Sequence, residues 1–160
     1  FVDNGTTALN IAASSVGGRL TLTSGNSITD SGTVTVGGWL HATTDANNGV
    51  INLGTLAVDG AVQLTTNGSG NATVVNDAGL TFAASTVGGN LSATATTGNV
   101  TQWGALSVTG TSSYTTSANN AYIALSYQTN AFTGAVSFNN TGSDGFATGS
   151  YTHLTMPTNA

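Results

Sequence analysis

Residues 9–20 read LNIAASSVGGRL, and the same phrase returns at residues 80–91 as LTFAASTVGGNL. Two further phrases recur in the same way, namely TTDANNGVINL (43–53) as TTSANNAYIAL (115–125), and TLAVDGAVQL (55–64) as TNAFTGAVSF (129–138). The offsets in residue number, by subtraction, are 71, 72 and 74, and so small a drift indicates short insertions in turns. The chain is therefore one unit of about 72 residues written twice, with repeat one at about 8–78 and repeat two at about 79–149.

A shorter signal recurs inside each unit, in which an apolar residue and any second residue are followed by glycine. It begins at Val16, Val36, Val58, Val87, Val108 and Phe132, so that the numbers of successive starts differ by 20, 22, 29, 21 and 24. Short segments that resemble one another at this period predict a β-solenoid, in which each coil stacks on the next. We expect an all-β fold of about six coils, three from each unit. A β-sandwich also has short strands and regular turns, but it does not require neighbouring segments to resemble one another.

Within a coil the pattern alternates with a period of two, as in GTVTVGGWLHATT (32–44). The residues expected to face inward are Val34, Val36, Leu40 and Ala42, and those expected to face outward are Thr33, Thr35, Trp39, His41 and Thr43. The glycine pair stands at a corner, and a second corner often reads GN or NN. We expect Gly and Asn there because corners need a left-handed or otherwise tight backbone.

The composition narrows the possible functions. The chain has 160 residues, enough for one domain, and only 4% of them are charged, with Arg19 as the sole Lys or Arg. Binding to nucleic acid or to an anionic membrane needs clustered basic residues, so neither partner is expected. No apolar run reaches the length of a membrane span, and the absence of cysteine excludes disulfides and thiolate metal sites. Many Gly, Thr, Ser and Asn residues with no Glu or Lys disfavour helix.

Trp39 and Trp103 are the candidate contact residues. Both stand at positions expected to face outward or to form a corner, where the core does not need a bulky aromatic side chain. An exposed indole can stack on a sugar or a partner protein. The alternative is that each ring covers side chains of a neighbouring coil.

The remaining polar residues do not predict a catalytic, cofactor or metal site. Asp45 and Asp59 are replaced by Ser117 and Thr133 in repeat two, whereas a repeated calcium site needs the same ligands in each copy. We therefore interpret the six aspartates as turn-capping residues, and His41 as an outward strand residue rather than a catalytic base. Outward threonine pairs occur at Thr21 and Thr23, Thr33 and Thr35, and Thr94 and Thr96. They raise the alternative of an ice-binding surface, although threonine also suits strand surfaces in general.

The repeat resembles a known family of bacterial proteins. Strings such as VGGNLSATATTGNVTQWGALSVTGTSSYTTSANNAYIAL (87–125) and NAFTGAVSFNNTGSDG (130–145) look like the β-strand repeats of large surface proteins of the filamentous haemagglutinin type. These are exported by two-partner secretion or as autotransporter passengers, and the resemblance covers nearly all of residues 1–149. It implies a right-handed parallel β-helix, secreted to or held at the bacterial outer surface.

The resemblance also implies a role. Such stalks serve adhesion or biofilm contact without an active site, and their partners are neighbouring coils of the same protein and glycans or proteins of a host surface or matrix. The alternative from another class is a polysaccharide-acting β-helix enzyme, which generally gathers Asp, Arg, Lys or His on one face. One arginine and no lysine make that alternative the weaker prediction.

The tail, residues 150–160, reads SYTHLTMPTNA and holds the only proline and the only methionine. Translated back into codons, SYTHLTMPT resembles a sequencing adaptor, with Met156 as the one departure. We therefore predict that the β-solenoid module spans residues 1–149 and that 150–160 are a non-native tail with no role.

Overall fold

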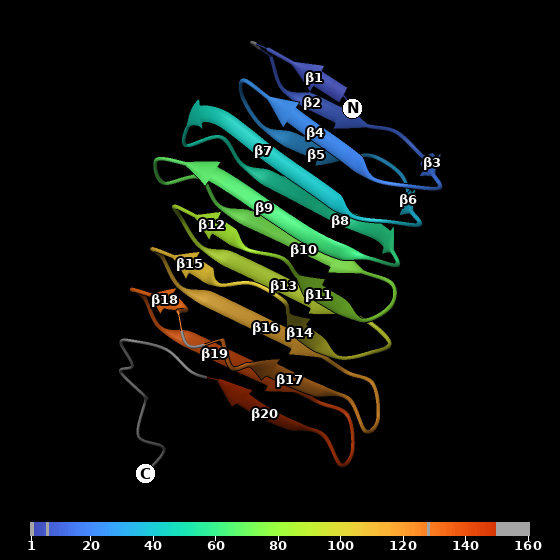
Figure 1. The fold of residues 1–160 in the computed structure, drawn as a ribbon, viewed down its shortest axis with the longest axis vertical. Coiled ribbons are helices and arrows are strands. Elements are labelled where there is room, and N and C mark those ends of the chain that lie inside the picture. The colour runs from blue at the N-terminus through green and yellow to red at the C-terminus, as the bar shows by residue number, and fades with distance from the viewer. Residues whose placement is uncertain (1, 6, 128, 150–160) are drawn as a thin grey trace.

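A computed structural model describes residues 2–5, 7–127 and 129–149 of the chain. These residues form twenty short strands, and every ladder between them is parallel. The chain winds from one sheet to the other and back, so that successive coils stack along one axis (Figure 1). Within the described ranges there is no helix that could span a membrane. The predicted tail at 150–160 lies outside the described residues.

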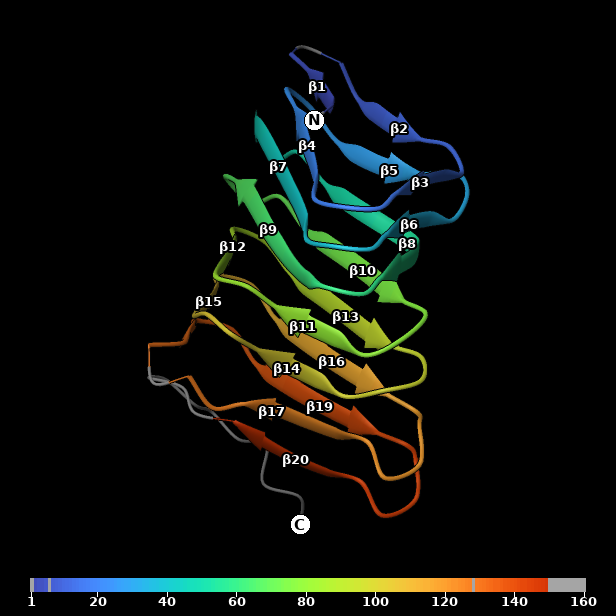
Figure 2. The same cartoon turned by 45° about the vertical axis from the view of Figure 1, so that its right-hand side comes forward.

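Two sheets face each other across the interior (Figure 2). Sheet A runs in the order β1 (Val2–Asn4), β4 (Leu20–Ser24), β7 (Leu40–Asn47), β9 (Ala61–Asn67), β11 (Leu80–Phe82), β14 (Val100–Gln102), β17 (Tyr122–Leu125) and β20 (Phe146–Gly149), with β12 (Ser85–Val87), β15 (Leu106–Val108) and β18 (Ala131–Phe132) as a branch from β9. Sheet B runs in the order β2 (Leu9–Ile11), β5 (Ile28–Asp30), β8 (Ile51–Val58), β10 (Ala72–Asn76), β13 (Leu91–Ala95), β16 (Ser112–Thr116) and β19 (Val136–Asn140), with β3 (Ser14–Val16) and β6 (Val34–Val36) as a branch from β8.

The register confirms the β-solenoid and gives its period. One inward column of sheet B joins, as successive strand partners, Leu9, Ile28, Ile51, Ala72, Leu91, Ser112 and Val136. The described residues therefore make about seven coils of roughly 21 residues, rather than the six counted from the glycine signal. The right-handed sense of the coil stays a prediction.

The two sequence units are half a coil out of step with the solenoid. In repeat one, β4 lies in sheet A, but its counterpart in repeat two, β13, lies in sheet B. The opening strand of repeat one, β2, lies in sheet B, whereas its counterpart β11 pairs with β9 in sheet A. Each unit is thus about three and a half coils long, and two units close seven whole coils. Counting three signals per unit missed the last half coil.

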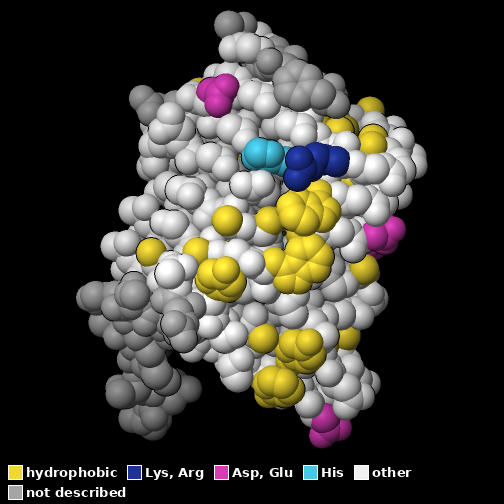
Figure 3. All heavy atoms as spheres, in the orientation of Figure 1, with side chains coloured by type: hydrophobic (Ala, Val, Ile, Leu, Met, Phe, Trp, Pro, Cys, Tyr) yellow, Lys and Arg dark blue, Asp and Glu magenta, His cyan; other side chains and the backbone are white. Residues whose placement is uncertain are grey.

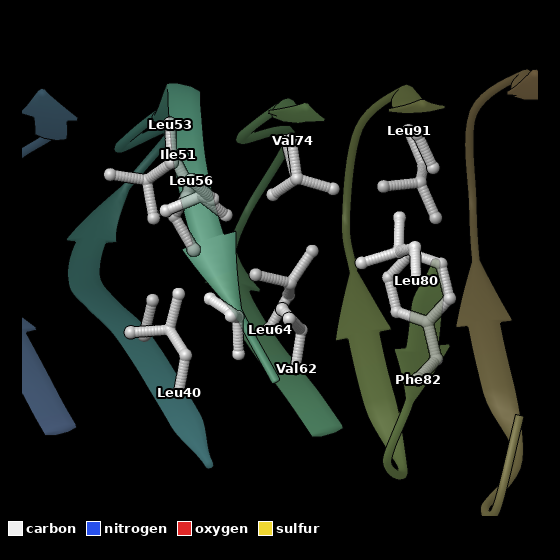
Figure 4. Packing of buried hydrophobic residues seen from close by; sticks show 14 of the residues in the cluster. Leu40, Ile51, Leu53, Leu56, Val62, Leu64, Val74, Leu80, Phe82 and Leu91 are labelled. Carbon is white, nitrogen blue, oxygen red and sulfur yellow. The ribbon is translucent and has the colours of Figure 1, made fainter. Parts of the chain in front are cut away.

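The core fills the interior along the length of the stack. The predicted inward residues Val34, Val36, Leu40 and Ala42 are all 0% exposed, as expected from the alternation. Figure 4 shows side chains of sheet A, such as Leu40 and Leu64, meeting those of sheet B, such as Ile51 and Leu53. Each fully buried aliphatic side chain of this size contributes about 1.5–3 kcal/mol relative to an exposed one. The apolar alternation in the sequence therefore becomes one continuous core.

Repeat two carries an aromatic cluster that repeat one lacks. Tyr114 is 0% exposed and packs against Phe82, Phe132 and Phe138, with ring centroids 6.0–6.2 Å apart. Its counterpart at the same place in repeat one is Ala42, which is also 0% exposed. The backbone path therefore repeats between the units, whereas the contents of the core do not.

The glycine signal has a different physical cause from the one expected. Of the described glycines only Gly68 has a left-handed backbone, with φ 63°. The glycine corner instead brings backbones into close contact: the amide of Gly38 donates to the carbonyl of Gly18 at 3.1 Å, and that of Gly60 donates to Gly38 at 3.1 Å. A Cβ on Gly60 would lie 2.6 Å from the carbonyl carbon of Gly38. The corner thus excludes side chains by lack of space.

The NN corners are left-handed, as expected, whereas the asparagines of the GN corners, Asn26 and Asn99, are not. Asn48 and Asn120 hold the same place in the two units and have φ values of 66° and 58°. Asparagine tolerates this conformation better than most residues with a side chain.

Candidate functional site

Trp39 and Trp103 contact each other on the outer surface of sheet A. Trp39 directly precedes β7 and is 39% exposed, and Trp103 directly follows β14 and is 60% exposed. Their ring centroids lie 5.9 Å apart, with the ring planes tilted by 52°. The predicted exposure of both indoles is confirmed, and the structure adds that they form a pair.

The two tryptophans come from strands that are well separated along the stack. Leu40, Val62, Phe82 and Gln102 are successive register partners, so Trp39 and Trp103 stand three coils apart. At about 4.8 Å per coil the strands that carry them are roughly 14 Å apart along the stack. The indole of Trp39 covers the glycine corner of the next coil, where its Cδ1 atom lies 3.0 Å from the place a Cβ of Gly60 would occupy. Each side chain therefore leans along the stack toward the other, and the alternative that Trp39 covers a neighbouring coil holds as well.

Arg19, the only Lys or Arg of the chain, lies beside the tryptophan pair. The guanidinium carbon of Arg19 lies 5.3 Å from the centre of the Trp39 ring, at cation–π distance. Such a contact contributes about 0.5–1 kcal/mol at an exposed site. We call Arg19, Trp39 and Trp103 the aromatic column. Figure 3 shows the single arginine in dark blue above hydrophobic side chains in yellow on this face.

His41 borders the aromatic column as an outward residue of β7, as expected. Its Nε2 atom lies 3.3 Å from the hydroxyl of Thr43. Partial burial, together with the nearby positive charge of Arg19, lowers the pKa of His41 below its ordinary value of 6.5. The side chain is therefore neutral at pH 7 and adds no second positive charge to the column.

A second aromatic pair lies nearer the C-terminal end of sheet A. Tyr122 in β17 and Phe146 in β20 are register partners, and their rings stack with centroids 5.3 Å apart and planes within 11°. Phe146 is 57% exposed. Sequence reasoning missed both pairs, because the partners are far apart along the chain and meet only once the register is known.

The aspartates are dispersed, and the best placed one is structural. The carboxylate of Asp30 accepts hydrogen bonds from the amides of Gly54 and Thr55 at 3.0 and 2.7 Å and from the Thr55 hydroxyl at 2.9 Å. It thus fastens one coil to the next. Asp144 stands in a turn with φ 58°, in agreement with the turn interpretation, whereas Asp45 lies in strand β7. Among the described residues no three of His, Cys, Asp or Glu lie close enough to hold a metal ion.

The threonine pairs do not combine into one array. Thr21 and Thr23 lie in β4 of sheet A, Thr35 lies in β6 and Thr94 in β13, both of sheet B. Sheet A carries one file of threonine register partners, which are Thr23, Thr43, Thr65 and Thr86, and a separate pair, Thr81 and Thr101. The neighbouring file contains His41 and Gln63, so it does not extend the threonine surface to a second column.

Sheet B carries a shallow groove of about 330 Å³ lined by small polar side chains such as Thr73, Ser92 and Ser113. Asparagine side chains hold its corner. The backbone amide of Asn90 donates to Oδ1 of Asn71 at 2.7 Å, and the backbone amide of Thr111 donates to Oδ1 of Asn90 at 2.8 Å. These asparagine carbonyls are already used in coil-to-coil contacts. The groove therefore offers small hydroxyls rather than charged or aromatic groups.

Comparison with known proteins identifies one family. The family described as "Repeats of unknown function (DUF5649)" matches residues 2–53 and 69–139, which is more than half of the chain. No curated protein and no solved structure matches. The match covers parts of both sequence units, in agreement with the internal repeat.

Proposed function

The chain belongs to this family of repeats, and we propose that it is a structural segment of a large, secreted bacterial surface protein, with the aromatic column as a contact site. The observation that supports the structural role is the continuous core, in which about seven coils pair strand to strand without interruption. A rod of this kind gains stability from each neighbouring coil and lengthens by adding coils. Export to the outer surface is supported by the resemblance to filamentous haemagglutinin repeats.

The adhesive part of the proposal rests on the aromatic column. Two indoles, 39% and 60% exposed, lie side by side on the outer surface of sheet A. Indole faces bind the C–H faces of sugar rings and the apolar side chains of proteins. Arg19 adds a donor for a sugar hydroxyl or a carboxylate. Glycans or glycoproteins of a host surface or matrix are the partners that fit this chemistry.

A non-enzymatic role is supported by the dispersal of the carboxylates. Asp30 is engaged in backbone hydrogen bonds, and Asp45, Asp59, Asp77 and Asp144 lie on different strands and turns. General acid–base hydrolysis of a polysaccharide needs two carboxyl groups on either side of one bond. An ice-binding role would need a flat threonine array, and the threonine file on sheet A supplies one column of it.

The adhesive proposal can be tested with the whole chain against immobilised chitin, cellulose, mannan and mucin. We expect retention on at least one of them, and a loss of about tenfold in affinity when Trp39→Ala and Trp103→Ala are combined, because tenfold corresponds to about 1.4 kcal/mol. Tyr127→Ala is the matched control, since Tyr127 is 46% exposed but lies in the segment between β17 and β18. Absence of retention on all four supports, or equal retention by the double variant, would contradict the contact site.

A further inference from the structure

Asparagine followed by glycine occurs three times in the chain, at residues 4–5, 48–49 and 67–68. Asparagine is a chemically labile residue. It loses its side-chain amide most readily before glycine, because a residue without a Cβ lets its backbone nitrogen approach the asparagine side-chain carbon Cγ. The pairs at 48–49 and 67–68 lie at the same corner of two adjacent coils, where β7 and β9 end side by side (Figure 1). The two pairs can therefore be compared directly.

The pair Asn67 and Gly68 is arranged for this reaction. Both residues are exposed, and the amide of Gly68 donates to Oδ1 of Asn67 at 2.8 Å. The side chain of Asn67 is thus folded back over the amide that follows it, with Cγ one bond beyond Oδ1. Gly68 has a left-handed backbone, with φ 63°, which glycine adopts without strain. Holding two reacting groups side by side in this way favours their intramolecular reaction.

The pair Asn48 and Gly49 is held in a different arrangement. Oδ1 of Asn48 accepts hydrogen bonds from the amide and the hydroxyl of Ser69, at 2.8 and 2.5 Å. The amide of Gly49 donates to the carbonyl of Ala46 at 3.1 Å, and Gly49 is buried. The asparagine side chain is therefore fastened to the next coil, and the amide that would attack it is engaged elsewhere.

We propose that Asn67 is a site of spontaneous deamidation, with water as the co-reactant, and that Asn48 is protected from it. The backbone nitrogen of Gly68 loses its proton to solvent and attacks Cγ of Asn67. The N–Cγ bond forms, the Cγ–Nδ2 bond breaks and Nδ2 leaves as ammonia, which yields a cyclic succinimide. Water then adds to one of the two ring carbonyl carbons, breaks its bond to nitrogen and leaves a carboxylate. Nothing is oxidised or reduced in either step.

The products alter the contact between the two coils. Opening of the ring at Cγ gives aspartate at position 67, and opening at the main-chain carbonyl carbon gives isoaspartate, whose backbone runs through the former side chain. Both products lack Nδ2, which donates to the carbonyl of Asp45 at 3.3 Å. Isoaspartate also lengthens a corner at which the carbonyl of Asn67 accepts from the amides of Asn48 and Gly70, at 3.0 and 3.2 Å. The modification therefore weakens the attachment of one coil to the next.

Peptide mapping of the whole chain by mass spectrometry gives the readout. The folded chain is kept at pH 8 and 37 °C over a time series and digested briefly with pepsin at low pH. The peptides that contain Asn48 and Asn67 are then quantified separately for exchange of the amide for a carboxylate. We expect the reaction at Asn67 to be at least about fivefold faster than that at Asn48, because the fold brings only the first pair together.

The same incubation in urea, at a concentration that unfolds the chain, is the matched control. Both sites are then asparagine–glycine pairs in an unfolded chain, so their rates should agree within about twofold. Asn67→Gln keeps a side-chain amide but needs a larger ring for the same attack. This variant should abolish the reaction at position 67 and leave the rate at Asn48 unchanged.

Two results would overturn the proposal. One is an equal rate at Asn48 and Asn67 in the folded chain. The other is a rate at Asn67 that is more than about tenfold slower in the folded chain than in urea, because the fold would then protect this site rather than position it for attack.

Asn67→Asp tests the consequence for the fold. This variant has the simpler of the two products and should unfold at a lower urea concentration than the unchanged chain, whereas an equal midpoint would show that the lost hydrogen bond to Asp45 does not matter. Retention on glycans should not change, because Trp39 precedes the start of β7 and Asn67 stands at the end of β9. Failure of the deamidation site and failure of the glycan contact are therefore separate outcomes.

Discussion

Repeat one and repeat two place the same strand phrase on opposite sides of the solenoid and fill it differently. In repeat one the column Leu22, Ala42 and Leu64 alternates large, small and large side chains. The corresponding column in repeat two, Ala93, Tyr114 and Phe138, begins small and then carries two aromatic rings. The backbone and its corners thus set the register. Within one inward column, a small side chain in one coil is compensated by larger side chains in the neighbouring coils.

The largest effect on the free energy of unfolding is expected from removing the aromatic ring that distinguishes repeat two. Tyr114→Ala makes the residue identical to its counterpart Ala42, but Phe82, Phe132 and Phe138 remain around a cavity that no neighbour fills. We expect a loss of about 3–5 kcal/mol in the free energy of unfolding, measured by urea denaturation. A loss below about 1 kcal/mol would show that the two units tolerate each other's core residues.

The glycine corner lies on opposite sides of the solenoid in the two units. We nevertheless expect a side chain at this corner to destabilise the fold to the same extent in both units. A Cβ on Gly60 meets the backbone of Gly38, and a Cβ on its counterpart Gly134 meets the backbone of Gly110. We expect Gly60→Ala and Gly134→Ala each to cost about 1–3 kcal/mol of unfolding free energy, through overpacking.

Gly18→Ala is the matched control for these two variants. Gly18 stands at the same corner in the first coil, where a Cβ has nothing within 4 Å. We expect its unfolding free energy to stay the same or to rise by about 0.4–1 kcal/mol. An equal loss in all three variants would mean that backbone conformation, and not close stacking, explains the glycines.

A smaller effect is expected from removing only the hydroxyl of Tyr114. In the described part of the chain this buried hydroxyl has no hydrogen-bond partner, and neither does that of Ser112. Burial raises the pKa of Tyr114 well above its ordinary value of 10, so the group stays neutral. We expect Tyr114→Phe to raise the free energy of unfolding by about 1 kcal/mol in the same denaturation assay. A loss of similar size would reveal a hydrogen bond in solution that the structure lacks.

The smallest effect concerns His41, which is particular to repeat one because repeat two has Ser113 there. Its pKa is lowered in the folded chain, so on acidification the unfolded chain takes up the proton first. Stability from this residue is therefore fully present above about pH 6.5 and declines as the pH falls below it. His41→Gln should flatten that decline in melting temperature between pH 7 and pH 5. Identical pH profiles for the two chains would assign the decline to other groups.

The sequence predicted the fold class and the facing of individual residues, because alternation and internal repetition are local signals. Val34, Val36, Leu40 and Ala42 point inward as predicted, and Trp39 and Trp103 are exposed as predicted. The half-coil offset was missed because strand phrases show that segments are alike but not which sheet they join. The pairing of the tryptophans was missed for the same reason, since it depends on a register that small insertions at each corner decide.

The predicted adaptor origin of residues 150–160 concerns residues outside the described part of the chain, and it stays a prediction. Independently obtained sequence of the parent gene tests it, and the same tail in that sequence would contradict it.

The half-coil offset is tested most directly by disulfide formation, because the chain has no cysteine of its own. Thr65 and Thr86 are register partners in sheet A, at a Cα separation of about 4.8 Å that a disulfide can bridge. Ser15, Thr35 and Ala57 are successive register partners in sheet B. Thr86 is the counterpart of Ser15 in repeat two, so units of three whole coils would place Thr86 beside Ala57. On mild oxidation we predict an intramolecular disulfide in Thr65→Cys with Thr86→Cys and none in Ala57→Cys with Thr86→Cys. The reverse pattern would contradict the three-and-a-half-coil unit.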